Sequence, residues 1–132
     1  PDDDALAALP LRRAPKVREN IRVVVVGDLQ RPFDVSPCGG SLVYTAASFT
    51  RFDSLKVEAG GNICLATLDI GAVTVVSPRG VLVEQPRMNA GDTHCTNLCF
   101  GGDDLQTVWL TLSHTGKLVR RRWARPGLAP AY

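Results

Sequence analysis

The chain has 132 residues, of which 45% are hydrophobic and 21% are charged, and its formal net charge at pH 7 is +2. This length allows one ordinary soluble domain with a hydrophobic core, and the small net charge gives no reason to expect nucleic-acid or membrane binding. No apolar stretch approaches the roughly 20 residues that span a bilayer, and residues 2–4 are acidic where a secretory signal peptide would be basic.

Residues 1–20 contain proline, alanine and arginine without a clear hydrophobic period, and we expect them to form an N-terminal arm. From residue 21 onward, short runs of β-forming residues alternate with turn-forming residues. Residues 129–132 are expected to be a tail. The predicted fold class is all-β, with nine strands at residues 21–26, 42–46, 54–58, 63–67, 72–76, 81–83, 96–100, 108–112 and 117–123.

A unit made of an apolar stretch, a glycine pair and a second apolar stretch occurs twice in full. Its glycine pairs lie at residues 60–61 and 101–102, and a shorter copy surrounds the pair at residues 39–40. Each copy predicts a β-hairpin, because glycine tolerates the positive φ that a tight reversal requires. Leu55 and Leu98 hold matching places in the two full copies, 43 residues apart, and propeller blades repeat about every 40–50 residues.

This period predicts antiparallel four-stranded blades of a β-propeller, of which the chain holds about two and a half. The expected units are a shortened blade at residues 21–52, a blade at residues 53–93 and a blade at residues 94–128. A propeller fragment would expose apolar faces and unpaired strand edges, which folded proteins avoid. We therefore expect a homo-oligomer or a complementary chain to complete the ring, unless the sequence lacks part of the natural protein.

The four cysteines, Cys38, Cys64, Cys95 and Cys99, lack the C-x-x-C spacing of a zinc site. Three of them lie in or beside apolar strand runs, so we interpret them as buried thiols that pack as small hydrophobic groups. Disulfides are the alternative, but they are typical of secreted proteins. Cysteine usage therefore favours a reducing, cytoplasmic compartment.

The basic run at residues 120–125, Arg-Arg-Arg-Trp-Ala-Arg, has two interpretations. An aromatic residue among arginines can meet phosphate groups, whereas arginines on a last strand protect its exposed edge from pairing with other chains. Edge protection is favoured, so no nucleic-acid partner is predicted. Nucleotide binding has no support either, because no glycine-rich loop precedes a helix.

Several sequence segments occur in a characteristic order. Residues 52–67 read FDSLKVEAGGNICLAT and residues 96–102 read TNLCFGG, followed at residues 109–113, 115–118 and 125–128 by WLTLS, TGKL and RPGL. Residues 27–46 look like a shortened version of the blade that precedes residues 52–67. Together these segments resemble the senescence marker protein/gluconolactonase/LRE-like family of six-bladed propellers.

The resemblance implies a hydrolase that opens sugar lactones with one divalent cation, calcium or zinc, held at one end of the central channel. Such a cation polarises the lactone carbonyl and lowers the pKa of a bound water. In this family the cation is typically held by a glutamate from the first blade, an asparagine after an Arg-Pro pair and an aspartate that opens a later blade. Asp53 matches that aspartate, and we expect it to be a metal ligand and a catalytic residue. A turn aspartate that caps backbone amides is the alternative.

The other two ligands are where the sequence departs from the family pattern. Phe33 follows Arg31 and Pro32, where the family places the asparagine, and Asp34 is the nearby oxygen donor that can substitute for it. No segment before residue 20 resembles the blade that supplies the glutamate. Asp34 is therefore the second predicted metal ligand, and one matching ligand out of three cannot hold a cation tightly.

Thr96 and Asn97 open an inner strand at the place in the repeat that Asp53 holds one blade earlier. We expect both to bind substrate, with Asn97 hydrogen bonded to a substrate hydroxyl; a structural asparagine that ends a loop is the alternative. His94 lies in the loop just before them and is predicted to bind substrate and carry a proton, since histidine titrates near pH 6.5. A solvated loop histidine is the alternative, and His114 is expected in a turn away from the channel.

The leading hypothesis is a metal-dependent lactone hydrolase of the gluconolactonase type, or a truncated relative, in which a cation activates water beside Asp53. The alternative is a non-catalytic binding or assembly module that keeps the propeller scaffold without a complete metal site. The unmatched asparagine and glutamate favour the module, whereas the retained aspartate and the channel-facing strands favour the hydrolase.

Overall fold

The computed structural model describes residues 23–26, 41–88 and 90–130. These residues form nine strands and no helix: β1 (Val23–Val26), β2 (Ser41–Thr45), β3 (Phe52–Val57), β4 (Ile63–Thr67), β5 (Ala72–Val76), β6 (Leu82–Glu84), β7 (Cys95–Gly101), β8 (Thr107–Leu112) and β9 (Lys117–Arg122). The all-β prediction is confirmed, and every predicted strand is present, β4 and β5 with the predicted ends. None of the described residues belongs to a helix that is long and apolar enough to cross a membrane.

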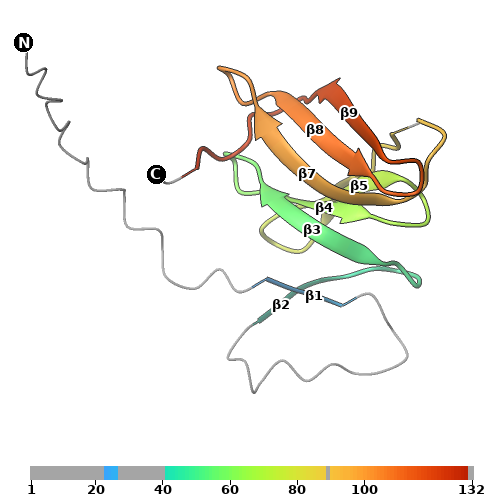
Figure 1. Ribbon diagram of the computed structural model, residues 1–132. Coiled ribbons are helices and arrows are strands. Elements are labelled where there is room, and N and C mark those ends of the chain that lie inside the picture. The colour runs from blue at the N-terminus through green and yellow to red at the C-terminus, as the bar shows by residue number, and fades with distance from the viewer. Residues whose placement is uncertain (1–22, 27–40, 89, 131–132) are drawn as a thin grey trace, which may run out of the picture.

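The strands form three separate sheets (Figure 1). A four-stranded sheet has the order β3-β4-β5-β6, and a three-stranded sheet has the order β7-β8-β9. All neighbouring strands in these two sheets are antiparallel, as predicted for propeller blades. β1 and β2 form the third, two-stranded sheet. Below, the four-stranded and three-stranded sheets are called the first and second blade.

Glycine pairs make the tight turns of both blades. Gly61 has a φ of 90° and Gly102 a φ of 80°, values that residues with a side chain rarely adopt. The second glycine of each pair thus provides the reversal that the repeat predicts. The third pair, at residues 39–40, lies outside the described residues.

The innermost strand of each blade carries an irregularity at the same place in the repeat. The register of β3 shifts between Phe52 and Leu55, and the register of β7 shifts between Cys95 and Asn97. Phe52 and Cys95 are 43 residues apart, which is the period deduced from the sequence. Because β-bulges re-aim side chains and are common beside active sites, both strand starts are candidate site positions.

The β1–β2 sheet differs from the two blades in direction. Its strands run parallel, with Val23 opposite Ser41 and Val26 opposite Thr45. A parallel pair needs a connection of a dozen or more residues, and residues 27–40 supply that length. A run of apolar residues predicts that a strand exists but says nothing of its direction, so sequence periodicity could not show this pairing.

Apolar side chains pack between the three sheets, which stack in chain order (Figure 1). On one face of the first blade, Ile63 and Leu65 pack against Val43 and Tyr44 of β2. On its other face a larger cluster joins the two blades, and its members from these strands are Cys64, Ala66, Val73, Val75, Cys95, Leu98, Val108, Leu110 and Leu112. β4 and β5 are buried at every position because both of their faces are covered.

A buried carboxylate joins the two blades just after β3. Glu58 is only 1% exposed, and it accepts hydrogen bonds from Trp123 Nε1 at 2.7 Å, from Arg125 Nε at 2.6 Å and from Asn62 Nδ2 at 2.8 Å. Arg125 also pairs with Glu84 of β6. Burial raises the pKa of Glu58, but the hydrogen bonds from Arg125, Trp123 and Asn62 lower it by more, so that its pKa lies below the ordinary value.

The segment after β9 extends this connection along β3. Leu128 N donates to Val57 O at 2.8 Å, and Ala59 N donates to Pro126 O at 2.9 Å. Gly127 lies between these two bonds and forms an antiparallel β-bridge with Glu58. The second blade is therefore fastened to the first by backbone pairing as well as by the Glu58 network.

The basic run divides between two structural roles. β9 is the edge strand of its sheet, and its exposed arginines agree with the edge-protection interpretation. Arg122 pairs with Asp104 at 2.6 Å, and Arg121 donates to the carbonyl of Met88. Trp123 and Arg125, which also belong to the run, instead donate hydrogen bonds to Glu58, the residue after β3 of the first blade.

Candidate functional site

Asp53 lies near the start of β3, inside the bulge, and its residue is exposed. Its carboxylate Oδ1 lies 3.5 Å from Ser54 Oγ, at the long limit of a hydrogen bond. Within the described part of the chain, no ion pair involves Asp53. Its oxygens are therefore accessible to a ligand.

Arg51, the basic residue nearest to Asp53 in the sequence, binds a different carboxylate. Arg51 Nε donates to Asp69 Oδ2 at 2.8 Å, and a second guanidinium nitrogen pairs with Asp69 Oδ1. The hydrogen bonds from Arg51 hold the pKa of Asp69 below its ordinary value. This fork between the residue before β3 and the turn after β4 leaves Asp53 unneutralised.

Thr96 and Asn97 lie at the corresponding bulge of β7, as the repeat predicts. Thr96 Oγ1 is 3.1 Å from Thr111 Oγ1 on β8, so this hydroxyl is tied to the neighbouring strand. Asn97 is exposed, and its Oδ1 accepts a hydrogen bond from Leu98 N at 2.8 Å. The amide oxygen of Asn97 is thus engaged locally, while its amide group borders a shallow pocket of about 160 Å³ that Lys56 of β3 also lines.

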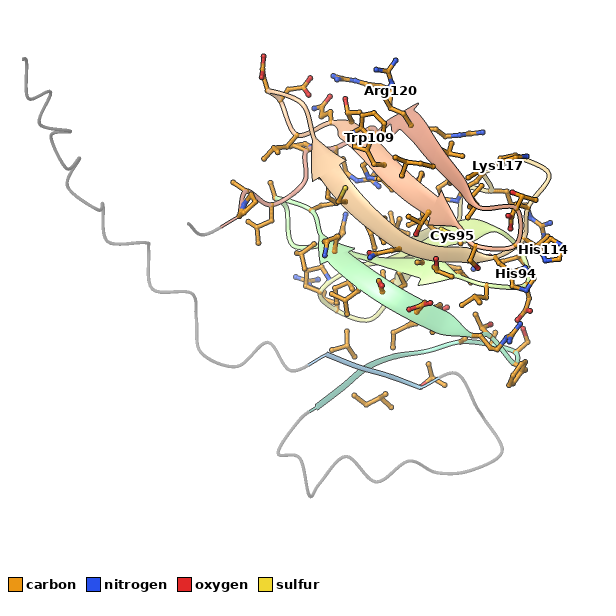
Figure 2. The ribbon with its side chains drawn as sticks, in the orientation of Figure 1. His94, Cys95, Trp109, His114, Lys117 and Arg120 are labelled. Carbon is orange, nitrogen blue, oxygen red and sulfur yellow. The ribbon has the colours of Figure 1, made fainter. Side chains whose placement is uncertain are left out.

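His94 stacks against His114 at the end of the blades where β7 begins (Figure 2). The ring centroids are 5.2 Å apart and the ring planes differ by 20°. Thr93 Oγ1 lies 3.3 Å from His94 Nδ1. The prediction of His114 in a turn agrees with its place between β8 and β9, but the sequence does not predict its contact with His94.

Asp92 holds the two histidine-bearing turns together, a role that no motif quoted from the sequence predicts. It is 6% exposed and accepts hydrogen bonds from His94 N at 2.8 Å, from Thr115 N at 2.6 Å and from Thr115 Oγ1 at 2.7 Å. Burial raises the pKa of Asp92, but these bonds lower it by more, so that it lies below the ordinary value. Its place between Gly91 and Thr93 is a turn signal, which could have suggested a capping aspartate.

The first strands of the two blades, β3 and β7, contact each other. Burial, together with the negative charges of Asp53 and Asp92, raises the pKa of the Cys95 thiol to about 11. The structure therefore brings Asp53, Thr96 and Asn97 to neighbouring strand starts, with His94 in the loop just before them. Asp34 lies outside the described residues.

A comparison with protein families bears on this arrangement. The sequence model of the SMP-30/gluconolactonase/LRE-like region matches residues 30–114. The chain belongs to this family. None of the curated proteins matches the chain.

The match to the SMP-30/gluconolactonase/LRE-like family begins before β2 and ends after β8. It therefore includes Asp53, His94 and both residues at the β7 bulge, and also Asp34. The family resemblance deduced from the motifs is confirmed over this range.

Members of this family generally depend on a metal ion. Divalent cations such as Ca²⁺ take several oxygen ligands at once. Among residues 41–88 and 90–130, no group of three or more His, Cys, Asp or Glu side chains is placed to hold a metal ion. The described residues alone therefore do not fit a divalent cation, since Asp53 is a single carboxylate donor.

Proposed function

We propose that the chain is a lactone hydrolase of the gluconolactonase type, and that Asp53 is the carboxylate that it contributes to a divalent cation, calcium or zinc. The observation that carries the proposal is the exposed Asp53 carboxylate, without an ion pair among the described residues, at the bulge of an innermost strand. Family membership supplies the reaction class. Further cation donors would come from Asp34, which lies outside the described residues, or from a partner.

The neighbouring residues have distinct proposed roles in binding a sugar lactone. The amide of Asn97 would donate to a substrate hydroxyl, because its oxygen is already bonded to the backbone. Thr96 would border the substrate while its hydroxyl stays tied to β8. His94 would carry a proton, since Asp92 fixes its backbone and leaves its ring partly exposed.

A non-catalytic assembly module is the second candidate function. It is favoured by the lack of a three-ligand cluster within the described residues. In that case the blades keep the family scaffold and the bulges have no chemical role. A cytoplasmic location stays a prediction for both candidates, and the free thiols of Cys64, Cys95 and Cys99 are compatible with it.

Substitution of Asp53 by asparagine tests the proposal with two readouts. Binding of Ca²⁺, Zn²⁺ and Mn²⁺ is measured by titration calorimetry, and opening of a sugar lactone is followed by acid release at constant pH. Asp53→Asn should weaken cation binding by at least about tenfold, the loss that even outer-shell partners cause, and the hydrolysis rate should fall with it. Asp103→Asn is the matched control, because Asp103 is exposed in the β7–β8 turn.

The proposal fails if the unaltered protein binds none of the three cations, or if Asp53→Asn binds them as tightly as the unaltered protein does. Binding without lactone opening would retain Asp53 as a ligand but remove the hydrolase assignment. An oligomeric mass for a protein that elemental analysis finds free of metal would support the assembly module.

A further inference from the structure

A pocket lies between the first blade and the segment that connects β2 to the start of β3 (Figure 1). Phe52 and Arg87 line it from the two ends of one cross-strand row, with Thr67 and Ala72 between them. Residues 46–50 of the connecting segment also line it. The pocket has a volume of about 240 Å³, whereas pockets for drug-sized ligands measure roughly 300–1,000 Å³. Its ligand must therefore be small.

A chain of hydroxyl groups determines which end of the Gln85 amide is free. Thr67 Oγ1 donates to the carbonyl of Leu65 at 2.9 Å and lies 2.7 Å from Thr74 Oγ1. Because a hydroxyl has only one hydrogen, Thr74 must donate to Thr67 and can only accept from Gln85. Gln85 Nε2 accordingly donates to Thr74 Oγ1 at 2.8 Å. The carbonyl oxygen of this amide is left to accept a hydrogen bond in the pocket that Gln85 lines.

Arg87 brings a positive charge to the pocket. Its backbone is held in place, because Arg87 forms an antiparallel bridge with Ala72 of β5. The ion pairs among the described residues do not include Arg87. The other charged residue of the lining, Asp69, is paired with Arg51. The guanidinium is therefore available to an anion, and its planar set of donors suits a carboxylate.

Aromatic rings in the lining suit a ligand with a ring of its own. The ring centroids of Tyr44 and Phe52 are 6.4 Å apart, and the ring planes are tilted by 60°. Phe49, also in the lining, is 70% exposed. A ring bound in the pocket would cover part of this apolar surface, and aromatic rings attract one another in tilted and offset arrangements.

We propose that this pocket binds a small aromatic hydroxy acid. Arg87 holds the carboxylate, the amide oxygen of Gln85 accepts the hydrogen of the ligand hydroxyl, and the aromatic side chains contact the ligand ring. Thr74 is a positioning residue, since it fixes the orientation of the Gln85 amide. The lining includes none of the residues assigned above to lactone hydrolysis, so the two sites can be tested separately.

Mandelate is the probe, because it carries a phenyl ring, a hydroxyl and a carboxylate. Phenylacetate lacks the hydroxyl, and mandelamide lacks the charge. Shifts of backbone amide signals in NMR titrations give the dissociation constant and the location of each ligand, and a chelator in the buffer excludes binding through a cation at Asp53. Mandelate should bind with millimolar affinity or better. Phenylacetate should bind about two- to tenfold more weakly, and mandelamide at least about tenfold more weakly. The largest shifts should lie at residues 48–50, 68–70 and 85–87.

Two substitutions test the assigned contacts in the same titration. Arg87→Gln removes the charge and should weaken mandelate binding at least about tenfold. Arg79→Gln is the matched control, because Arg79 is exposed in the β5–β6 turn and does not line the pocket. Gln85→Met keeps the length of the side chain and should abolish the preference for mandelate over phenylacetate. Circular dichroism checks that each variant is folded.

The proposal is overturned if mandelate does not bind, if it binds no better than mandelamide, or if its shifts centre on β7 instead of the pocket. Equal weakening by Arg87→Gln and Arg79→Gln also contradicts it, as does a full preference for mandelate in Gln85→Met. If Arg87→Gln does not fold, the three ligands compared on the unaltered protein and on Gln85→Met decide the question.

Discussion

Glu58 and Asp53 lie toward opposite ends of β3, and their carboxylates meet opposite environments. Glu58 is buried and accepts hydrogen bonds from three side chains that carry N–H groups. Asp53 is exposed and has one long contact with a hydroxyl. A buried charge needs such partners, so Glu58 is committed to structure and Asp53 remains accessible for binding.

Removing the Glu58 carboxylate should destabilise the protein strongly. Glu58→Ala leaves the Trp123 and Arg125 donors without their acceptor, and loss of one partner from a buried ion pair costs about 3–5 kcal/mol. The free energy of unfolding from urea titration measures the effect. Glu84→Gln removes only the partly exposed partner of Arg125 and should cost about 1 kcal/mol or less. Equal losses in the two variants would contradict the structural role of Glu58.

Cysteine reactivity should follow burial. Burial and the neighbouring Glu58 raise the pKa of Cys64, and the pKa of Cys95 is raised to about 11. Because the thiolate is the reactive form, iodoacetamide at neutral pH should modify the exposed Cys99 and spare Cys64 and Cys95 until denaturant is added. Mass spectrometry of tryptic peptides reads out each position. Early modification of Cys64 or Cys95 would show that the blades do not pack as described.

The candidate site could be predicted only in part, because sequence matching finds positions and not contacts. The repeat of 43 residues predicts that Asp53 and Thr96 lie at matching strand starts, where the structure has them, while their roles stay predictions. The stacking of His94 on His114 could not be predicted. It depends on Asp92, which accepts hydrogen bonds from His94 in its own turn and from Thr115, more than twenty residues further along the chain.

Individual strands were predictable because each combines β-forming residues with glycine or polar turns at its ends. β4 and β5, whose five positions each are all buried, show the near-continuous apolar runs expected of strands covered on both faces. The segment after β9 was not recognised as an element. It holds its position through single backbone bonds to Val57 of β3, to Ala59 and to Leu105, and residues such as Pro126 and Gly127 carry no strand signal.

Gly127 is a sensitive point in that segment. A Cβ atom there would overlap the ring of Phe100, and the backbone on either side is hydrogen bonded to Ala59 and to Val57 of β3. Gly127→Ala should therefore cost about 1–3 kcal/mol, as overpacking usually does. Thermal unfolding followed by circular dichroism measures the change.

Gly60→Ala provides the comparison, since a Cβ at Gly60 meets nothing within 4 Å. Its effect should stay within about 0.5 kcal/mol. If both alanine variants unfold at the same temperature, the C-terminal segment does not press against the second blade.

At the scale of the whole molecule, the three sheets depend on one another for burial. The first blade is covered on both faces, and neither of its neighbours packs against the other in the described clusters. A single blade exposes too much apolar surface to be stable alone. We therefore expect both blades to unfold together.

Acid should reveal this coupling, because Glu58 and Asp92 both have pKa values below the ordinary ones. Their stabilisation is fully present above the unfolded-state values of about 4.3 and 3.9 and is lost as the pH falls through the lower folded values. The free energy of unfolding should thus decline from about pH 5 to about pH 3. Tryptophan fluorescence and far-ultraviolet circular dichroism should report the same transition.

Glu58→Gln is the control for the acid response. It cannot release a proton, so its stability should start lower at neutral pH and decline less steeply on acidification. Parallel curves for Glu58→Gln and the unaltered protein would show that Glu58 does not contribute to acid unfolding.

The paired bulges of β3 and β7 have a consequence for how this scaffold can change. One backbone kink is built twice, and it presents an exposed carboxyl group at Asp53 but, at Thr96, a hydroxyl that is hydrogen bonded to Thr111. Exchange of a single side chain at either kink would alter the chemistry offered to a ligand while the supporting strands stay as they are. Strand pairing and site chemistry therefore depend on different residues, so the side chains at the bulges can change without disrupting the sheets.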